Sequence, residues 1–134
     1  QKIPVSGAVI VTTPQDIALI DAQKGLAMFE KVNIPILGIV ENMSIHICSN
    51  CNHAEEIFGN GGGERMAATS NTKFLGALPL KLEIRTDVDE GTPSVAKDPE
   101  SKVSMMYQEI ARNVAATLSL QSESIGAFPK ITIE

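Results

Sequence analysis

The clearest signal along the chain is a set of short, continuous apolar runs. Residues 8–12 are AVIVT and residues 36–40 are ILGIV, both rich in β-branched side chains and without polar alternation. Runs of this kind are typical of strands in parallel sheets, which are buried on both faces. Residues 74–80, FLGALPL, form a third short apolar run, which Pro79 ends. The pattern therefore predicts three core strands.

The segment between the first two runs has the spacing of a helix. The segment TPQD at residues 13–16 offers Thr13 as a cap, Pro14 for the first turn and Asp16 as the acid of a capping box. From there to about Asn33, apolar residues recur at steps of three and four, at Leu19, Ala22, Leu26 and Phe29. A strand, a helix and a second strand in this order predict a right-handed βαβ unit.

The rest of the chain continues this alternation. Residues 59–71, GNGGGERMAATSN, predict a glycine loop that opens a short helix, whereas residues 81–101 are polar and predict a surface loop. Ser101 is expected to cap a long helix. Its apolar face is expected to contain Val103, Met106, Ile110, Val114 and either Thr117 or Leu118. The predicted fold class is α/β, with a mostly parallel sheet flanked by helices.

Length and composition indicate one domain. A chain of 134 residues with 43% hydrophobic content can bury one sizeable core. We expect this domain to cover residues 1–120, with a C-terminal tail at 121–134 in which KITIE is at most an edge strand. The chain opens with QKIPVSGAVIV, lacks an initial Met and soon reaches a core strand, so we expect a fragment of a longer protein.

Charge and hydropathy exclude several kinds of partner. The net charge of -5, the pI near 5.0 and the lack of any Lys or Arg cluster argue against a nucleic-acid partner. The longest apolar runs are far shorter than the roughly 20 residues that a membrane helix needs, and the N-terminus lacks a signal-peptide pattern. We therefore expect no membrane partner and a cytoplasmic location.

Candidate chemistry is concentrated in MSIHICSNCNH, residues 43–53. This stretch holds the only cysteines and histidines of the chain, with Cys48 and Cys51 at CxxC spacing and His46 and His53 two positions outside them. In a reducing compartment such a pair binds metal or carries out redox chemistry more often than it forms a structural disulfide. Cys48 and Cys51 are therefore the candidate metal ligands, within an insertion at residues 43–58.

A tetrahedral zinc or an iron–sulfur cluster usually needs four ligands, so the pair lacks two. His46 and His53 could supply them only if one tight loop wrapped the ion, and we expect both to be solvated turn residues. A twofold axis through the site would instead bring two CxxC turns together, which indicates a homodimer. Two reduced thiols in a surface turn and a thioredoxin-like redox pair remain alternatives.

Two further features bear on ligand binding. Asn42 ends the second strand at its carboxyl edge, where open α/β sheets bind ligands, so its carboxamide could contact a base or a sugar. A turn-forming role is the alternative. The segment GNGGGER is not a P-loop, because Glu64 and Arg65 take the places of the Lys and the Ser or Thr that hold phosphate and magnesium. Its glycines are expected to be a flexible entry to a helix.

Three blocks of the sequence together resemble one family. They are GAVIVTTPQDIALIDAQKGLAMFEKVNIPILGIVENMS, CSNC followed by EIFGNGGGE, and LGALPLKLEIRTDVDEGTP. Over residues 3–120 the chain is similar to the C-terminal half of the Mrp/ApbC proteins, iron–sulfur cluster carriers that are MinD-like P-loop ATPases with a deviant Walker A loop. The resemblance implies that Cys48 and Cys51 of two subunits share a [4Fe-4S] cluster, and that Asn42, Pro79 and Leu80 line the adenine.

The resemblance also implies an activity for the intact protein. It would bind ATP and Mg²⁺, hydrolyse ATP and pass its cluster to apo iron–sulfur proteins. The family's lysine-containing Walker A loop and magnesium-binding acids lie N-terminal to the part that this sequence matches, so we expect this chain alone to be inactive. In a non-enzymatic alternative, Cys48 and Cys51 of two chains form a structural zinc site that staples a dimer.

Overall fold

A computed structural model describes residues 5–121 of the chain. The elements in chain order are β1 (Ala8–Thr12), α1 (Asp16–Lys31), β2 (Ile36–Glu41), β3 (His46–Ile47), β4 (Ala54–Glu55), α2 (Gly62–Thr69), β5 (Phe74–Ala77), α3 (Leu82–Asp89), α4 (Ser94–Lys97) and α5 (Lys102–Gln121). Apart from Gln121, which ends α5, the predicted tail with its KITIE segment lies outside the described residues. Within the described range, no helix is long and apolar enough to cross a membrane.

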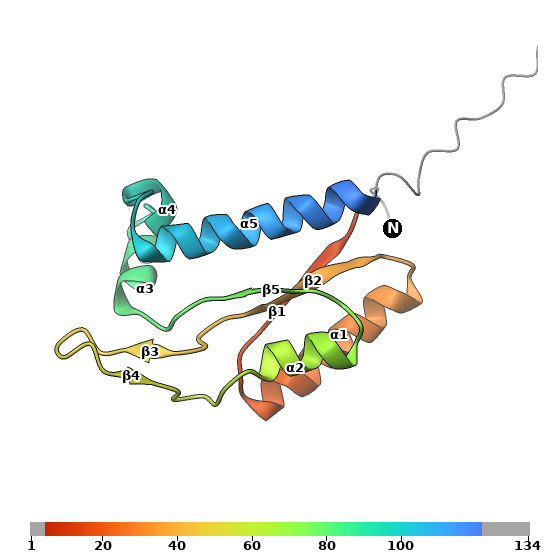
Figure 1. The fold of residues 1–134 in the computed structure, drawn as a ribbon, viewed down its shortest axis with the longest axis horizontal. Coiled ribbons are helices and arrows are strands. Elements are labelled where there is room, and N and C mark those ends of the chain that lie inside the picture. Colours follow the sequence, from red (N-terminus) through yellow and green to blue (C-terminus); the bar gives the residue numbers. More distant parts are fainter. Residues whose placement is uncertain (1–4, 122–134) are drawn as a thin grey trace, which may run out of the picture.

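The three predicted strands form one parallel sheet. Their order is β1-β2-β5, so β2 is central and, in the described part of the chain, β1 and β5 each have one unpaired edge. Helices α1 and α2 pack on one face and α5 on the other, which gives three layers (Figure 1). The α/β class and the βαβ unit are confirmed.

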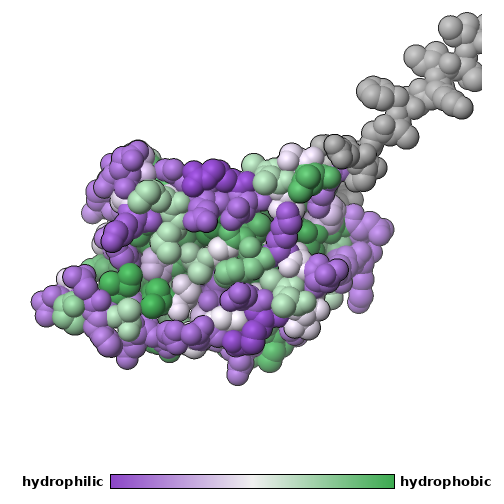
Figure 2. All heavy atoms as spheres, in the orientation of Figure 1, coloured by the Kyte–Doolittle hydropathy of each residue, from purple (hydrophilic) through white to green (hydrophobic). Residues whose placement is uncertain are grey.

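Each face of the sheet has its own apolar cluster. On the α1 and α2 side, the buried residues are Ile10, Leu26, Ile39, Met66 and Ala67, and the predicted stripe of α1 packs against them. On the α5 side they are Val40, Leu75 and Leu78. Figure 2 shows apolar residues gathered in the middle of the visible face, with hydrophilic residues around its rim.

The apolar face of α5 differs from the prediction at one position. Val103 is buried and Ile110 and Val114 pack on the sheet, but Met106 is 37% exposed and Tyr107 packs in its place. The steps of four and three from Val103 through Tyr107 to Ile110 follow the helical period, and Met106 lies off that line. Thr117, rather than Leu118, continues the buried face.

Of the two helix caps predicted from the sequence, the structure confirms one. The predicted Thr13 cap of α1 is wrong, because the Thr13 hydroxyl donates to Oε1 of Gln15 at 3.0 Å and α1 begins at Asp16 without a side-chain cap. The Ser101 cap of α5 is confirmed by a 3.1 Å hydrogen bond from the Ser104 N–H to Oγ of Ser101.

The predicted surface loop at residues 81–101 is also wrong, since it contains α3 and α4. The buried residue of α3 is Asp87, whose carboxylate accepts hydrogen bonds from Oγ of Ser94 at 2.8 Å and from Nζ of Lys97 at 2.6 Å. The Ser104 hydroxyl in turn donates to the Ser94 carbonyl at 3.0 Å. Because polar side chains join these helices, and the helical spacing of apolar residues in α3 is limited to Ile84 and Val88, the segment was predicted to be a loop.

Candidate functional site

The two cysteines lie in the turn of a small β-hairpin. Strands β3 and β4 pair antiparallel, and in the connecting turn the Cys48 N–H donates to the His53 carbonyl at 2.9 Å. The Asn52 N–H donates back to the Cys48 carbonyl at 2.9 Å. The hairpin projects beyond the carboxyl edge of the sheet (Figure 1). Cys48 is half-buried, Cys51 is exposed and both are free thiols, so a ligand can reach the pair from solvent.

The turn favours the thiolate form of Cys48. The backbone N–H of Asn50, the backbone N–H of Cys51 and the Cys51 thiol together hold the pKa of the Cys48 thiol below its usual value, against opposing contributions from burial and from the Glu55 charge. A thiolate is the form that binds metal or attacks a disulfide. The turn therefore increases the share of Cys48 that is in the metal-binding thiolate form.

A single hairpin offers two sulfur ligands. Among residues 5–121, no three His, Cys, Asp or Glu side chains converge as a metal site. His53 is an exposed turn residue, as predicted. His46 is not, because it is a half-buried strand residue that pairs with Glu55 and bridges to Leu80.

One pocket, of about 270 Å³, is lined by Asn42 together with Pro79 and Leu80, which lie far from Asn42 in the sequence. The other lining residues are Met43, Lys81, Ile84, Arg85, Val88, Asp89 and Tyr107. Those from α3 were missed because the segment was predicted to be a loop. The signal available in the sequence was the spacing of four from Ile84 to Val88 and from Arg85 to Asp89, the latter an ion pair of 2.8 Å.

Asn42 has local hydrogen bonds as well as a pocket position. Its N–H donates to the Thr12 carbonyl at 2.7 Å, and its Oδ1 accepts the Met43 N–H at 2.9 Å. The second contact reaches only the next residue, whereas the bond of an Asx turn reaches the amide two residues on. Residues 42 and 43 nevertheless bend the chain after β2, as the turn-forming alternative expects, and Asn42 also lines the pocket, where a ligand could contact it.

Backbone hydrogen bonds join this pocket to the cysteine hairpin. The Ser44 N–H donates to the Leu78 carbonyl at 3.0 Å, and the Leu80 N–H donates to the Ile45 carbonyl at 2.8 Å. The segments that leave β2 and β5 therefore stay side by side past the end of the sheet. The segment after β2 runs from Asn42 to the hairpin, and the segment after β5 contains Pro79 and Leu80, which line the pocket.

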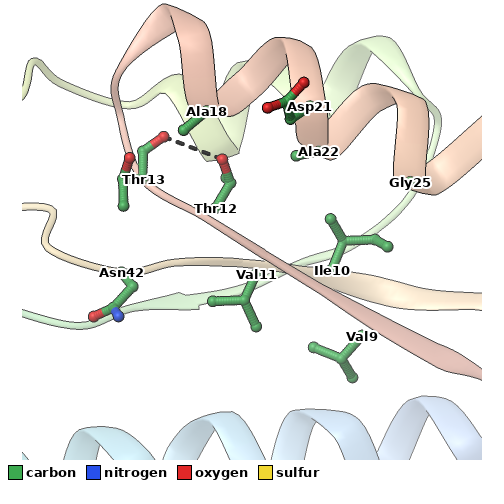
Figure 3. A pocket seen from close by; sticks show the side chains of 10 residues that line it. All are labelled: Val9, Ile10, Val11, Thr12, Thr13, Ala18, Asp21, Ala22, Gly25 and Asn42. Atoms are coloured by element: carbon green, nitrogen blue, oxygen red, sulfur yellow. Dashed lines mark hydrogen bonds between the residues drawn. The ribbon is translucent and has the colours of Figure 1, made fainter.

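A larger hollow, of about 530 Å³, follows the free edge of β1 (Figure 3). Small residues of α1, Ala18, Ala22 and Gly25, form one wall. Val11 points away from α1 and is 60% exposed. Asn42, which follows β2, lines this groove as well as the smaller pocket.

The two glycines that open α2 are closely packed. A Cβ on Gly62 would lie 2.7 Å from Cδ1 of Leu19, and one on Gly63 would lie 3.0 Å from Cβ of Glu41. The Gly63 N–H donates to Oε2 of the buried Glu41 at 2.6 Å. The start of α2 therefore binds a carboxylate of its own chain, and the expectation of a flexible entry does not hold for Gly62 and Gly63.

Comparison with known proteins identifies a family. The model of the ParA family, described as "NUBPL iron-transfer P-loop NTPase", matches residues 1–115. The chain is 59% identical over 125 residues to the iron-sulfur cluster carrier protein of Escherichia coli K12, covering 93% of this chain and 34% of that protein. It is 49% identical over 123 residues to the iron-sulfur cluster transfer protein NUBPL of Mus musculus, covering 92% and 39%. The chain thus spans between a third and two fifths of the length of these relatives.

Solved structures agree on the fold. The septum site-determining protein MinD of Pyrococcus horikoshii, complexed with Mg-ADP, matches with a TM-score of 0.65 at 24% identity, over 87% of this chain and 44% of that one. The nucleotide-binding protein of Archaeoglobus fulgidus in complex with ADP matches with a TM-score of 0.58 at 31% identity, over 72% and 38%. The fold is MinD-like. As its resemblance to the Mrp/ApbC proteins indicates, the chain belongs to the family of NUBPL iron-transfer P-loop NTPases.

Proposed function

We propose that the intact protein is an ATP-dependent iron–sulfur cluster carrier, and that this chain supplies its thiol ligands and the base side of its nucleotide pocket. The observation that carries the proposal is the CxxC hairpin, with a stabilised Cys48 thiolate, built onto the wall of the pocket that holds Asn42, Pro79 and Leu80. The names of the relatives in Escherichia coli and Mus musculus support the carrier role.

The cluster is the cargo in this proposal. One hairpin has two thiols, so a [4Fe-4S] cluster needs Cys48 and Cys51 from each of two chains. Exposure of the hairpin lets an apo iron–sulfur protein bring its own thiolates to the irons and replace these ligands one at a time. A reducing compartment such as the cytoplasm would keep the four cysteines reduced.

The nucleotide part rests on the pocket and on the family. We assign Asn42, Pro79 and Leu80 to the adenine side of an ATP site whose phosphate and Mg²⁺ contacts come from a phosphate-binding loop that this sequence lacks. Residues 1–120 would then be part of a P-loop ATPase domain, with 43–58 as its cysteine-bearing insertion and 121–134 as its tail. Hydrolysis would occur only in the intact protein.

The second candidate is a zinc-stapled dimer without cluster transfer. It is favoured by the same count of ligands, because four thiolates from two hairpins also suit a tetrahedral zinc. The two functions differ in a simple observation. A bound iron–sulfur cluster gives a brown protein with charge-transfer absorption, whereas zinc gives a colourless one.

The test uses the intact protein, reconstituted anaerobically with iron and sulfide. We expect about four irons per dimer, loss of the cluster and weaker dimerisation in Cys48→Ala and in Cys51→Ala, and no change in His53→Ala, an exposed neighbour in the same turn. The loaded dimer should then activate an apo iron–sulfur protein. A strictly monomeric preparation that holds a full cluster through these cysteines would overturn the bridged arrangement. A colourless protein that binds zinc and takes up no cluster would favour the zinc candidate.

A further inference from the structure

Met43 has a backbone conformation that few residues with a side chain adopt. Its φ is +57°, in the left-handed region. In the described part of the chain, the other non-glycine residues with positive φ are all asparagines: Asn33, Asn52 and Asn71. Asparagine tolerates this region because its short side chain can bond to nearby backbone, which Met cannot do. The neighbours of Met43 must therefore hold it there.

Hydrogen bonds on both sides of Met43 provide that hold. Before it, Oδ1 of Asn42 accepts the Met43 N–H at 2.9 Å. After it, Ser44 donates twice to the Leu78 carbonyl, from its N–H at 3.0 Å and from its Oγ at 3.1 Å. Residues 42–44 thus form a strap that is fixed at both ends.

The strap connects the pocket to the thiols. Asn42 and Met43 both line the pocket, so a ligand there contacts the strap directly. Beyond the strap the chain runs straight into β3 and on to Cys48, and the Leu80 N–H holds it through the Ile45 carbonyl at 2.8 Å. A change in the Met43 backbone therefore reorients the start of the hairpin.

We propose that the strap couples occupation of the pocket to the geometry of the cysteine hairpin, an inference that rests on the proposed function. A base that hydrogen-bonds to the Asn42 carboxamide turns this group toward itself, and Oδ1 then leaves the Met43 N–H. Once this bond is lost, the Met43 backbone is less restrained and can return to an ordinary conformation. Ser44 and the hairpin shift with it. A cluster shared by two hairpins resists this shift.

Such coupling is reciprocal, so cluster loading must change the nucleotide dissociation constant. The experiment titrates the intact protein calorimetrically with Mg²⁺ and a non-hydrolysable ATP analogue, with and without its cluster. We expect the two dissociation constants of the wild type to differ by about fivefold or more. In Met43→Gly, where the left-handed conformation is no longer unfavourable, their ratio should lie within about twofold of one.

Two controls isolate the backbone of the strap. Asn33→Gly makes the same kind of change at a φ of +55°, just after α1, and should keep the wild-type ratio. Met43→Ala removes the side chain but keeps the conformational constraint, so it should keep most of the ratio. If Met43→Gly folds poorly, Ser44→Ala, which removes only the Oγ bond to Leu78, should also lower the ratio.

The proposal is overturned if the wild-type ratio is one, or if Met43→Gly and Ser44→Ala both keep the wild-type ratio. In either case cluster binding and transfer can still be measured, so the carrier function can stand while the coupling fails. A wild-type protein that binds no iron–sulfur cluster would contradict both the carrier function and the coupling.

Discussion

Nζ of Lys97, on α4, donates a 2.6 Å hydrogen bond to Oδ1 of Asp87, the buried residue of α3. Ser94 also donates to this carboxylate, at 2.8 Å. The pair anchors the helix that forms one wall of the candidate nucleotide pocket, since Ile84 and Val88 of α3 line it. A polar contact between two short helices therefore holds one wall of the pocket.

The first prediction concerns this pair and pH. Hydrogen bonds from Lys97 and Ser94 hold the pKa of Asp87 below its usual range, and Asp87 raises the pKa of Lys97. The Asp87 contribution to stability is thus present above its unfolded pKa, about 3.9, and is lost as the pH falls through its folded pKa. The Lys97 contribution is present below about pH 10.4 and is lost as the pH rises through its raised pKa.

Asp87→Asn should accordingly lower the thermal midpoint at neutral pH, by an amount that shrinks in acid. Asp89→Asn is the matched control, because Asp89 is on the same helix but its side chain is 61% exposed and forms an ion pair with the likewise exposed Arg85. Thermal melts followed by circular dichroism from neutral pH to about pH 2 check this. Equal losses in the two variants would contradict the anchoring role.

The second prediction compares two glycines. Gly62→Ala should destabilise the chain by about 1–3 kcal/mol, because the new Cβ would lie 2.7 Å from Leu19 and 3.1 Å from the Pro14 carbonyl. Gly25→Ala, inside α1 with nothing within 4 Å of the added Cβ, should instead stabilise it by about 0.5–1 kcal/mol. Urea unfolding of the three proteins measures both, and a stable Gly62→Ala would show that the contact with α1 can relax.

The third prediction concerns thiol reactivity. Because amides of the turn lower the pKa of Cys48, its alkylation by iodoacetamide should reach its plateau at a lower pH than that of a cysteine in an unstructured peptide. Glu55→Gln should lower the pKa of Cys48 further, since the Glu55 charge opposes the thiolate. Glu56→Gln, at the next position, should leave the profile unchanged. Mass spectrometry with site-resolved fragmentation follows each cysteine.

The fourth prediction tests Asn42 in the intact protein. Asn42→Ala should weaken ATP binding by on the order of 1 kcal/mol, the contribution of a base-edge hydrogen bond, without affecting contacts to the triphosphate. Calorimetric titration with ATP and with GTP measures both affinity and selectivity. If the affinity for neither nucleotide changes, Asn42 is a turn residue that bonds to Thr12 and Met43.

The fifth prediction concerns the 134-residue chain on its own. The free edge of β1 and the groove beside it expose backbone groups and Val11, so the chain should associate through this edge or be only marginally stable. It should not bind ATP with useful affinity, because it lacks a phosphate-binding loop. Light scattering coupled to size-exclusion chromatography, followed by ATP titration, examines both points. A stable monomer with micromolar ATP affinity would contradict them.

Much of the framework could be predicted from the sequence, because its signals are local. Apolar runs located all three strands of the parallel sheet, and periodic apolar residues located α1 and the long α5. The spacing of Cys48 and Cys51 pointed to a turn that presents two thiols. These features depend on residues within a few positions of one another, so one sequence was enough to find them.

The structure had to decide whatever depends on contacts between distant segments. The strand-end position of Asn42 suggested ligand binding, but Leu80 was nominated only by family resemblance. It is the parallel pairing of β2 with β5 that brings the two residues to one pocket. Helix α3 has a buried aspartate in place of an apolar stripe, so its partners on α4 had to be in position before it could be recognised. Likewise, the left-handed conformation of Met43 is imposed by Asn42 and by the Leu78 carbonyl beyond Ser44, because nothing in a methionine favours it.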